Sequence, residues 1–554
     1  MYIIGISAHY HDSSVCLFKD GLLVYACEEE KFTGIKHDST FPYNSLTYAI
    51  KRYKITNEQI EAICYYEDPK LKLQRVKNNI KNLSLKNLLF SIKSYLTAKS
   101  NIKKIDDELR KYSNNVFYST HHESHHYYSY YSSKFKDSLS LSVDGVGEID
   151  TVSFAVPGHK GLDYYSLGEY PHSLGLYYSA MTSFLGFRPN EGEYKVMGLA
   201  SYGTPDKFID KVRKLITYNN SNLQCNLDVF VWNKSNKIMF NEKLSELLGI
   251  EQRLPEEQLD QTHMDLASAV QKRYEEILFE ILKTLSLFNT QTNLCLSGGC
   301  AYNGTANGKI IDETNFKHLW IPPAPSDAGS SIGACVHYLV TVKNRIPKIP
   351  NNPFIGPMYG YESTIKHFKI KKVKRFDNDN NLLNEIAKEI NSGKVVGWFQ
   401  GGCEFGARAL GNRSILANPT IDGMKDKINK VIKKREGFRP FAPMVTKEKQ
   451  NVFFDMKDDI PYMNQVVKVK PEYRDILKAT THVDGTARVQ TVYPNSRIHF
   501  LLTKFEKLSG YPILLNTSFN VKDKTMVLTP KDAIETFYDT EMDILVLGNY
   551  LIHK

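Results

Sequence analysis

One pattern, a strand followed by an acidic turn and a second strand, occurs twice in the sequence. The first copy predicts strands at 2–7, 15–18 and 22–26, and the second predicts strands at 138–143 and 151–156. Apolar and polar residues alternate along 138–143, as in a half-buried strand. In the first copy a polar turn, His-Tyr-His-Asp-Ser-Ser (9–14), follows the first strand, and Lys19-Asp20-Gly21 joins the next two strands. In the second copy the polar turn is Asp144-Gly145-Val146-Gly147-Glu148. An internal duplication of this kind constrains the chain to two related α/β halves.

Two related halves that close over a nucleotide are the plan of the actin-like ATPase fold. Residues 293–303 predict a strand that ends at Gly298-Gly299, with a helix to follow. Glycines at such a turn let backbone amides approach a ligand, and a helix N-terminus favours an anion. Residues 325–333 form a second such element and place Asp327 at a predicted N-cap.

A histidine-rich stretch, 121–126, lies just before the second copy of the duplicated unit. His121 and His125 are four positions apart, so both lie on one side of a helix. A following strand that ends at Asp144 would bring a carboxylate to the two imidazoles, and Asp327 would be a fourth ligand if it faces them. Such donors suit Fe(II), Mn(II) or Zn(II). The alternatives are a polar helix surface and an Asp327 that only caps its helix.

The stretch 341–357 contains four prolines and predicts a domain boundary. We therefore expect one domain at 1–350 and another at 351–554. The second domain carries glycine-framed or clustered basic residues, including Arg408, Arg439 and Lys433. Arginines on ordered turns suit bidentate binding of phosphate or carboxylate, so we expect an anion site. Salt bridges between domains are the structural alternative.

Composition indicates a globular protein of the cytoplasm. The hydrophobic content is 42% and the charged content 24%. No run of eighteen apolar residues and no signal-peptide pattern is found, so we expect no membrane span. The eight cysteines form no Cys-x-x-Cys pair, which favours a reducing compartment.

Residues 69–105 contain ten basic residues and no acidic one, which accounts for the whole net charge of +10. The basic residues are Lys70, Lys72, Arg75, Lys77, Lys81, Lys86, Lys93, Lys99, Lys103 and Lys104. Apolar residues punctuate them in a roughly helical pattern. A solvated lysine face is the simplest interpretation. A docking surface for an anionic acceptor, a membrane or nucleic acid is the alternative.

A series of motifs resembles the NodU/CmcH/TobZ family of O-carbamoyltransferases. The motifs are Gly-Ile-Ser-Ala-His-Tyr-His-Asp-Ser-Ser (5–14), Glu-Glu-Glu-Lys-Phe-Thr (28–33), Lys-His-Asp (36–38), the His-His-x-x-His stretch, Val-Asp-Gly-Val-Gly-Glu (143–148), Glu-Tyr-Lys-Val-Met-Gly-Leu-Ala-Ser-Tyr-Gly (193–203), Ser-Gly-Gly-Cys-Ala-Tyr-Asn (297–303), Pro-Ser-Asp-Ala-Gly (325–329) and Asn-Thr-Ser-Phe-Asn (516–520). The resemblance implies an actin-like domain of the ASKHA, TsaD-type class followed by a YrdC-like α/β domain.

The resemblance also implies an activity. The YrdC-like domain joins carbamoyl phosphate to ATP, with Mg, releasing pyrophosphate and giving carbamoyl adenylate. The actin-like domain then passes the carbamoyl group to a hydroxyl of a small-molecule natural product or sugar, and iron helps hold the adenylate. No nucleic-acid partner is expected.

Site residues follow from the resemblance position by position. His121, His125, Asp144 and Asp327 resemble the iron ligands; Arg408, Lys433 and Arg439 match carbamoyl-phosphate contacts; Gly298, Gly299, Asn303, Asn516, Ser518 and Asn520 match nucleotide contacts; His11 and Lys36 match the transfer site. His11 is the expected base, with His37 as the alternative.

Departures from the family pattern leave some alternatives open. Bulky residues follow His125, so a shifted pair, His122 and His126, is conceivable. Asp523-Lys524-Thr525 replaces a Gly-Glu-Pro loop. Other functions compatible with parts of the sequence are a tRNA threonylcarbamoyl-type transferase and a nucleotide-gated binding protein.

Overall fold

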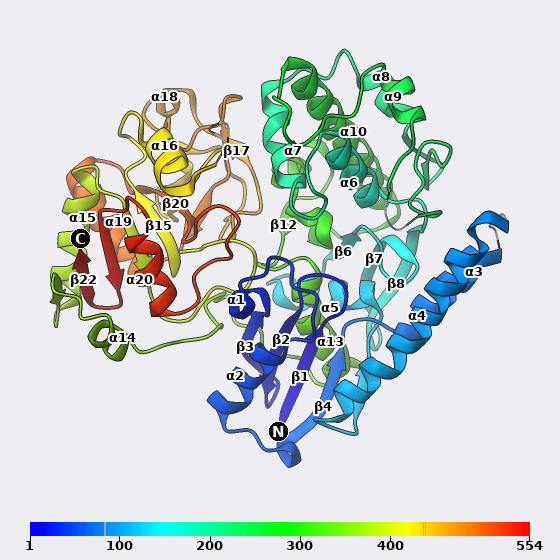
Figure 1. The fold of residues 1–554 in the computed structure, drawn as a ribbon, viewed down its shortest axis with the longest axis horizontal. Coiled ribbons are helices and arrows are strands. Elements are labelled where there is room, and N and C mark those ends of the chain that lie inside the picture. Colours follow the sequence, from blue (N-terminus) through cyan, green and yellow to red (C-terminus); the bar gives the residue numbers. More distant parts are fainter. Residues whose placement is uncertain (82–84, 236–237, 436, 438) are drawn as a thin grey trace. The chain divides into compact units, whose positions relative to one another are not determined.

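The computed structural model describes residues 1–81, 85–235, 238–435, 437 and 439–554 (Figure 1). It divides into two compact units. The first unit comprises residues 1–24, 39–303 and 310–350, and the second comprises 25–38, 304–309 and 351–554. The segments 25–38 and 304–309 therefore group with the second unit, although a boundary at residue 350 would assign both to the first.

Two five-stranded sheets of the same topology form the frame of the first unit (Figure 1). The first sheet has the order β3 (Leu22–Glu28), β2 (Ser14–Lys19), β1 (Tyr2–Ser7), β4 (Ile60–Tyr65), β5 (Val116–Tyr118). The second has the order β8 (Gly161–Glu169), β7 (Asp150–Gly158), β6 (Leu139–Val143), β11 (Asn293–Ser297), β12 (His318–Trp320). In each sheet the central strand pairs antiparallel with its hairpin partner and parallel with the next strand. The predicted duplication and the actin-like fold are confirmed.

Two helices follow the last strands of the sheets and occupy equivalent places. Helix α5 (His121–Ser132) follows β5 and packs on β6 and β11, whereas α13 (Asp327–Thr341) follows β12 and packs on β1, β2 and β4. The two helices also pack against each other. Small residues allow this approach: a Cβ at Gly333 would lie 1.7 Å from the carbonyl oxygen of Ser124. Close packing of α5 on α13 brings the first turns of the two helices together.

Helices fill the connections between the strands of the first unit. The first sheet carries α2 (Tyr43–Tyr53), α3 (Pro69–Lys81) and α4 (Leu85–Arg110), and the second carries α6 (Leu174–Phe184), α7 (Glu193–Leu199), α8 (Ile209–Arg213), α9 (Lys243–Leu248), α10 (Gln261–Phe288) and α12 (Ile310–Glu313), with the hairpin β9 (Ile216–Asn219) and β10 (Asn222–Cys225). The helical pattern expected in the basic segment is confirmed by α3 and α4, whose side chains at 78–94 and 98 lie outside the described part. No helix among the described residues is long and apolar enough to cross a membrane.

The second unit is a mixed α/β domain around an eight-stranded sheet. The strand order is β13 (Val373–Arg375), β22 (Tyr550–His553), β21 (Ile544–Leu547), β14 (Val396–Phe399), β15 (Arg413–Ala417), β20 (Ile513–Ser518), β16 (Ala442–Thr446), β19 (Gln490–Val492). One face of the sheet is covered by α15 (Asp379–Asn391) and α19 (Arg497–Ser509). The other is covered by α20 (Pro530–Tyr538) and the π-helical segment η4 (Lys427–Lys433). The α/β class is confirmed for this unit too, as the resemblance to a YrdC-like domain implies.

Neighbouring side chains on β14 show how the second core is divided between the two faces. Trp398 packs with the side chains of α15 and α19, whereas Phe399 packs with those of α20 and η4. Both rings are fully buried. Alternate residues of a strand point to opposite faces of its sheet, so a sheet covered on both faces has an almost continuous apolar run, as Val395–Phe399 is here.

Candidate functional site

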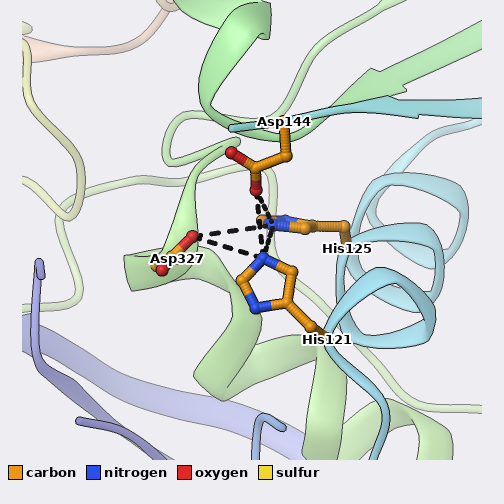
Figure 2. A group of neighbouring side chains, drawn as sticks. All are labelled: His121, His125, Asp144 and Asp327. Atoms are coloured by element: carbon orange, nitrogen blue, oxygen red, sulfur yellow. Dashed lines mark hydrogen bonds and ion pairs between the residues drawn. The ribbon is translucent and has the colours of Figure 1, made fainter. Parts of the chain in front are cut away.

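Four side chains from three separate segments of the first unit converge at one point (Figure 2). His121 and His125 project from the first two turns of α5, Asp144 follows the last residue of β6, and Asp327 is the first residue of α13. All four side chains are buried. The structure thus brings together the four residues for which the sequence predicted a metal site.

The ligand atoms of the four residues are close enough to share one ion. The Nε2 atoms of His121 and His125 lie 3.1 Å apart, and each lies 3.0 Å from Oδ2 of Asp144. Oδ1 of Asp327 lies 3.6 Å from Nε2 of His121 and 3.7 Å from Nε2 of His125. All four potential ligand atoms lie within 4.8 Å of one another.

The local sequence holds each ligand in place. Helix α5 begins where the Thr120 side chain accepts a hydrogen bond from the backbone N–H of Glu123, and the Thr120 hydroxyl donates to the Glu123 carboxylate at 2.6 Å. Asp144 Oδ1 accepts from the N–H of Gly145 at 2.7 Å. Nδ1 of His125 lies in a 3.1 Å hydrogen bond with the Ser330 hydroxyl, which leaves Nε2 turned toward the carboxylates.

Burial sets the charge of the cluster. Burial lowers the pKa of His121 to about 3, so the ring is neutral and its Nε2 can act as a ligand. Burial raises the pKa of Asp144, but hydrogen bonds from His121 and His125 outweigh that effect and hold it well below its usual range. Burial also raises the pKa of Asp327, to about 7. His121 is therefore a neutral imidazole and Asp144 an ionised carboxylate, the protonation states that metal ligands require.

Asp327 shows most directly that the cluster fits a cation. Its side chain is 1% exposed, and neither carboxylate oxygen has a hydrogen-bond partner among the described residues. A buried carboxylate without such partners is strongly disfavoured unless a cation neutralises it. Two imidazole nitrogens and two carboxylates suit Fe(II), Mn(II) or Zn(II).

The alternative pair, His122 and His126, does not belong to this cluster. Nδ1 of His122 and Nε2 of His126 lie 2.6 and 2.8 Å from the Ser153 hydroxyl, and Nδ1 of His126 lies 2.8 Å from that of Ser140. The two rings therefore face the serines of β6 and β7. The shifted ligand pair that the sequence left open is wrong for this structure. Asp327 is likewise not an N-cap, because Ser326 holds that position.

His11 lies beside the cluster, in the loop that follows β1. Its Nε2 is 3.7 Å from Oδ2 of Asp327, and its Nδ1 is 3.0 Å from Oδ2 of Asp12. Burial lowers the pKa of His11, but the charges of Asp327 and Asp12 outweigh burial and raise it to about 10. The ring centre of Tyr10 lies 4.5 Å from that of His11. Of the residues expected at the transfer site, His11 thus lies next to the metal-type cluster, which consists of His121, His125, Asp144 and Asp327.

The predicted glycine cradle lies at the same edge of the second sheet. Gly298 has φ +88°, and a Cβ there would lie 2.2 Å from the carbonyl oxygen of Val143. A Cβ at Gly299 would lie 3.1 Å from Oδ1 of Asp144. The Asn303 amide exchanges two 3.0 Å hydrogen bonds with the amide of Gln271. The two glycines therefore let their backbone pack directly against the end of β6 and the side chain of Asp144.

A second set of predicted residues meets in the second unit. The Lys433 ammonium is buried and donates to the backbone carbonyl and the hydroxyl of Ser518. It also donates to the Asn520 carbonyl at 3.1 Å and to its side-chain oxygen at 2.6 Å. Burial holds the pKa of Lys433 well below its usual range, and the charges of Arg435, Arg439 and Lys36 lower it further. Lys433, Ser518 and Asn520 thus form one group beside several cations.

The cation group of the second unit is larger than the sequence predicted. Burial holds the pKa of Arg488 well below its usual range, and the charges of Arg408, Arg435 and Arg439 lower it further. Nε of Arg488 has no hydrogen-bond partner among the described residues. Several cations gathered around the buried guanidinium of Arg488 form a site that favours an anion. Arg488 and Arg435 were missed because Arg488 has no basic neighbour in the sequence and Arg435 is one of three consecutive basic residues.

Three other predicted residues of the second unit have local partners. The Asn516 amide donates to the carbonyl oxygen of Ala409 and to the Gln490 side chain, both at 2.9 Å. The backbone N–H of His37 donates to the Glu30 carboxylate at 2.9 Å. Lys36 acts electrostatically on Lys433. Lys36 is therefore one of the cations of the second unit. Asn516, on β20, holds the neighbouring segments through its side-chain hydrogen bonds to Ala409 and Gln490.

Two family models match the chain and together cover most of it. The model described as carbamoyltransferase N-terminus matches residues 2–336, and the model described as carbamoyltransferase C-terminus matches residues 387–554. The chain belongs to the carbamoyltransferase family. Membership makes this protein a transferase and confirms the resemblance stated from the sequence motifs.

Relatives of this carbamoyltransferase include nodulation proteins of rhizobia. The chain is 35% identical to the nodulation protein NolNO of Sinorhizobium fredii, over 98% of this chain and 79% of that protein. It is 35% identical to NolO of Bradyrhizobium diazoefficiens, over 78% of each. An uncharacterized protein of Synechocystis is 36% identical over 100% of this chain and 97% of its own length. The similarity thus extends across both units of the carbamoyltransferase.

Solved structures resemble the carbamoyltransferase only distantly. HypF of T. kodakarensis has a TM-score of 0.34 at 13% identity, covering 62% of this chain and 48% of that one. Component A of the (R)-2-hydroxyglutaryl-CoA dehydratase of Acidaminococcus fermentans has a TM-score of 0.35 at 11% identity, covering 62% and 98%. The assignment of the carbamoyltransferase fold rests instead on its own strand order.

Proposed function

We propose that this carbamoyltransferase makes carbamoyl adenylate from carbamoyl phosphate and ATP and passes the carbamoyl group to a hydroxyl of a small-molecule natural product or sugar. The observation that carries the proposal is the presence of two differently built sites. The second unit gathers cations around Lys433 and Arg488, and the first gathers imidazoles and carboxylates around Asp327. The cations of the second unit suit polyanionic reactants. The imidazoles and carboxylates of the first unit suit activation of a carbonyl.

The first half-reaction is assigned to the second unit. Water cleaves carbamoyl phosphate to carbamate and inorganic phosphate, and a carbamate oxygen then attacks the α-phosphorus of Mg-ATP. The bond between the α-phosphorus and the bridging oxygen breaks, and pyrophosphate leaves. Arg408, Lys433 and Arg439, together with Arg435 and Arg488, bind the phosphates and stabilise the charge that develops on them. Ser518 and Asn520 orient the Lys433 ammonium.

The transfer step is assigned to the first unit. The acceptor oxygen bonds to the carbamoyl carbon, the bond from that carbon to the adenylate oxygen breaks, and AMP leaves. The hydroxyl proton passes to a base, for which we propose His11, with His37 as the second candidate. Gly298, Gly299 and Asn303, which lie at the same edge beside Asp144, are proposed to contact the adenylate.

His121, His125, Asp144 and Asp327 would hold the metal, for which Fe(II) is proposed and Mn(II) or Zn(II) would also fit. When bound, the metal supplies Lewis acidity toward the carbamoyl carbonyl and offsets the charge of Asp327. A cation bound at Asp327 would weaken the attraction that raises the pKa of His11, and the imidazole would then be better able to accept a proton.

The experiment that tests the proposal follows the two half-reactions separately. Full-length protein loaded with Fe(II) is incubated with ATP and carbamoyl phosphate, and pyrophosphate, phosphate, AMP and carbamoyl adenylate are measured. Pyrophosphate release that requires carbamoyl phosphate is expected. Arg408→Ala is expected to lower this release by about tenfold to a hundredfold, the effect of losing a charged hydrogen bond. His121→Ala is expected to keep pyrophosphate release and to accumulate the adenylate.

The matched control is Lys430→Ala, because Lys430 is an exposed cation of η4, the segment that ends at Lys433. Its pyrophosphate release should equal that of the wild-type protein. A wild-type protein that releases no pyrophosphate would contradict adenylate formation. Equal loss of both half-reactions in His121→Ala would contradict the assignment of one step to each unit.

A further inference from the structure

The basic helices α3 and α4 have no role in the proposed reaction, yet α3 contacts the loop that carries Asp144. The two helices pack against each other and connect β4 to β5 (Figure 1). Most of the described lysines of this segment, such as Lys77 and Lys104, are exposed. Arg75 differs from them, because its side chain is half-buried and reaches the loop that carries Asp144.

Arg75 holds that loop by its backbone. Its Nη1 donates a hydrogen bond to the carbonyl oxygen of Gly147, three residues after Asp144. The guanidinium carbon lies 5.3 Å from the centre of the Tyr170 ring, so the planar group also stacks on an aromatic face. A guanidinium held by a carbonyl and a ring has a defined orientation.

Gly147 in turn packs against His121, one of the four candidate metal ligands. A Cβ at Gly147 would lie 3.2 Å from both Cβ and Cδ2 of His121, and 2.8 Å from Cδ2 of His122. The backbone of the loop therefore lies in contact with the His121 side chain. A shift of Gly147 would change the space in which the His121 ring is held.

Glu148 ties the same elements together. Its buried carboxylate accepts hydrogen bonds from the backbone N–H of His121 at 2.9 and 3.0 Å. It also accepts one from the backbone N–H of Asp68, which directly precedes α3, at 2.6 Å. The start of α3, the loop after β6 and the start of α5 thus share one buried carboxyl group, and Arg75 adds a second link between α3 and the loop.

We infer that Arg75 is a positioning residue of the metal site: through Gly147 it sets the position of the His121 imidazole. The inference rests on the proposed metal site and gives the basic segment a structural role there. Groups that orient a metal ligand typically change metal affinity by about tenfold to a hundredfold when they are removed. Arg75 belongs to this class because it contacts the loop and not the ligands themselves.

The test measures metal binding by the full-length protein, without any reaction. Co(II) alone is titrated against a competing chelator and followed by its visible absorption, which reports coordination geometry. Arg75→Met is expected to weaken Co(II) binding by about tenfold to a hundredfold and to alter the spectrum. Arg75→Lys is expected to recover part of the affinity, because an ammonium can donate to a single carbonyl. Lys77→Met, two positions away on α3, is the matched control and should bind as the wild-type protein does.

The outcomes separate this inference from the proposed function. Wild-type protein that binds Co(II), with Arg75→Met indistinguishable from Lys77→Met in affinity and spectrum, overturns the role of Arg75 alone. Wild-type protein that binds no Co(II) overturns the metal site and the role of Arg75 together. Unfolding temperatures of the metal-free variants establish that each is folded. If Arg75→Met is not, Arg75→Gln gives the same test, because its polar side chain is too short to span the same contact.

Discussion

His121 and Asp327 occupy equivalent positions in the two halves of the first unit. Each is the first residue of the helix that follows the last strand of its sheet, α5 after β5 and α13 after β12. Nε2 of His121 lies 3.6 Å from Oδ1 of Asp327. Two further groups also follow the duplication: Asp144 comes after β6, and His11 lies in the loop after the equivalent strand β1. The candidate site is therefore built where two related halves present the same structural edge.

The convergence of four ligands predicts a strong dependence of metal affinity on each of them. Replacing His125 by Ala removes one nitrogen and leaves the buried carboxylate of Asp144 with one imidazole fewer. We expect affinity for Zn(II) to fall by more than about a hundredfold, a larger loss than removal of an orienting group produces. Chelator competition measures this directly. His159→Ala, an exposed histidine in the turn between β7 and β8, should change nothing, and equal affinities of the two variants would contradict the site.

The cation group of the second unit predicts that Arg488 contributes to anion binding. Its Nε has no hydrogen-bond partner among the described residues, and other arginines lower its pKa. We expect Arg488→Met to weaken binding of inorganic pyrophosphate by about tenfold to a hundredfold, since hydrogen bonds to charged groups contribute about 1.5–3 kcal/mol. Isothermal titration calorimetry of pyrophosphate with each variant measures the change. Binding that is as tight in Arg488→Met as in Lys430→Met would show that Arg488 has only a packing role.

The backbone at Gly298 predicts a position that tolerates no side chain. Its φ of +88° is strained for other residues, and a Cβ would meet the carbonyl oxygen of Val143 at 2.2 Å. We expect Gly298→Ala to lower the free energy of unfolding by about 1–3 kcal/mol and to weaken metal binding, because Val143 precedes Asp144. Thermal unfolding and Co(II) titration measure the two effects. Gly360→Ala, where a Cβ would have no atom within 4 Å, is the matched control, and equal unfolding temperatures would contradict the prediction.

The local patterns of the sequence predicted the parts of the fold that depend on neighbouring residues. Strand alternation and Asp-Gly turns gave the duplicated unit, and the four-residue spacing gave the pair His121 and His125. The strand alternation and the histidine spacing both involve residues only a few positions apart, so they can be recognised from the sequence alone. The choice between this pair and His122 with His126 was not legible, because both pairs have the same spacing. Contacts with Ser153 and Ser140, on other elements, decide it.

Long-range packing accounts for what the sequence left out. Arg488 belongs to the cation group only because the second unit brings its segment beside Arg408 and Arg439, which are far from it in the chain. The segment 25–38 groups with the second unit although it continues a strand of the first sheet. Neither property has a local signature, because each depends on which distant segments share a core.

The buried ammonium of Lys433 predicts a pH dependence with a definite sign. Burial holds its pKa in the folded protein well below the ordinary value of 10.5. Below the lowered pKa both the folded and the unfolded state carry the proton, so this group gives no pH dependence there. Between the lowered pKa and 10.5 the unfolded state binds more protons, so the stability of the folded protein rises with pH.

Lys433→Met removes this titration, so the wild-type protein should gain stability relative to the variant as pH rises through that window. Urea unfolding of both proteins at pH 7 and near pH 9.5 measures the difference in the free energy of unfolding. Lys430→Met is the control, because Lys430 is an exposed lysine of the same segment. The variant also loses the donors to Ser518 and Asn520, which shifts its stability by a constant amount at every pH. Only the slope with pH reports the buried charge, and a difference that stays flat or falls with rising pH would contradict a lowered pKa at Lys433.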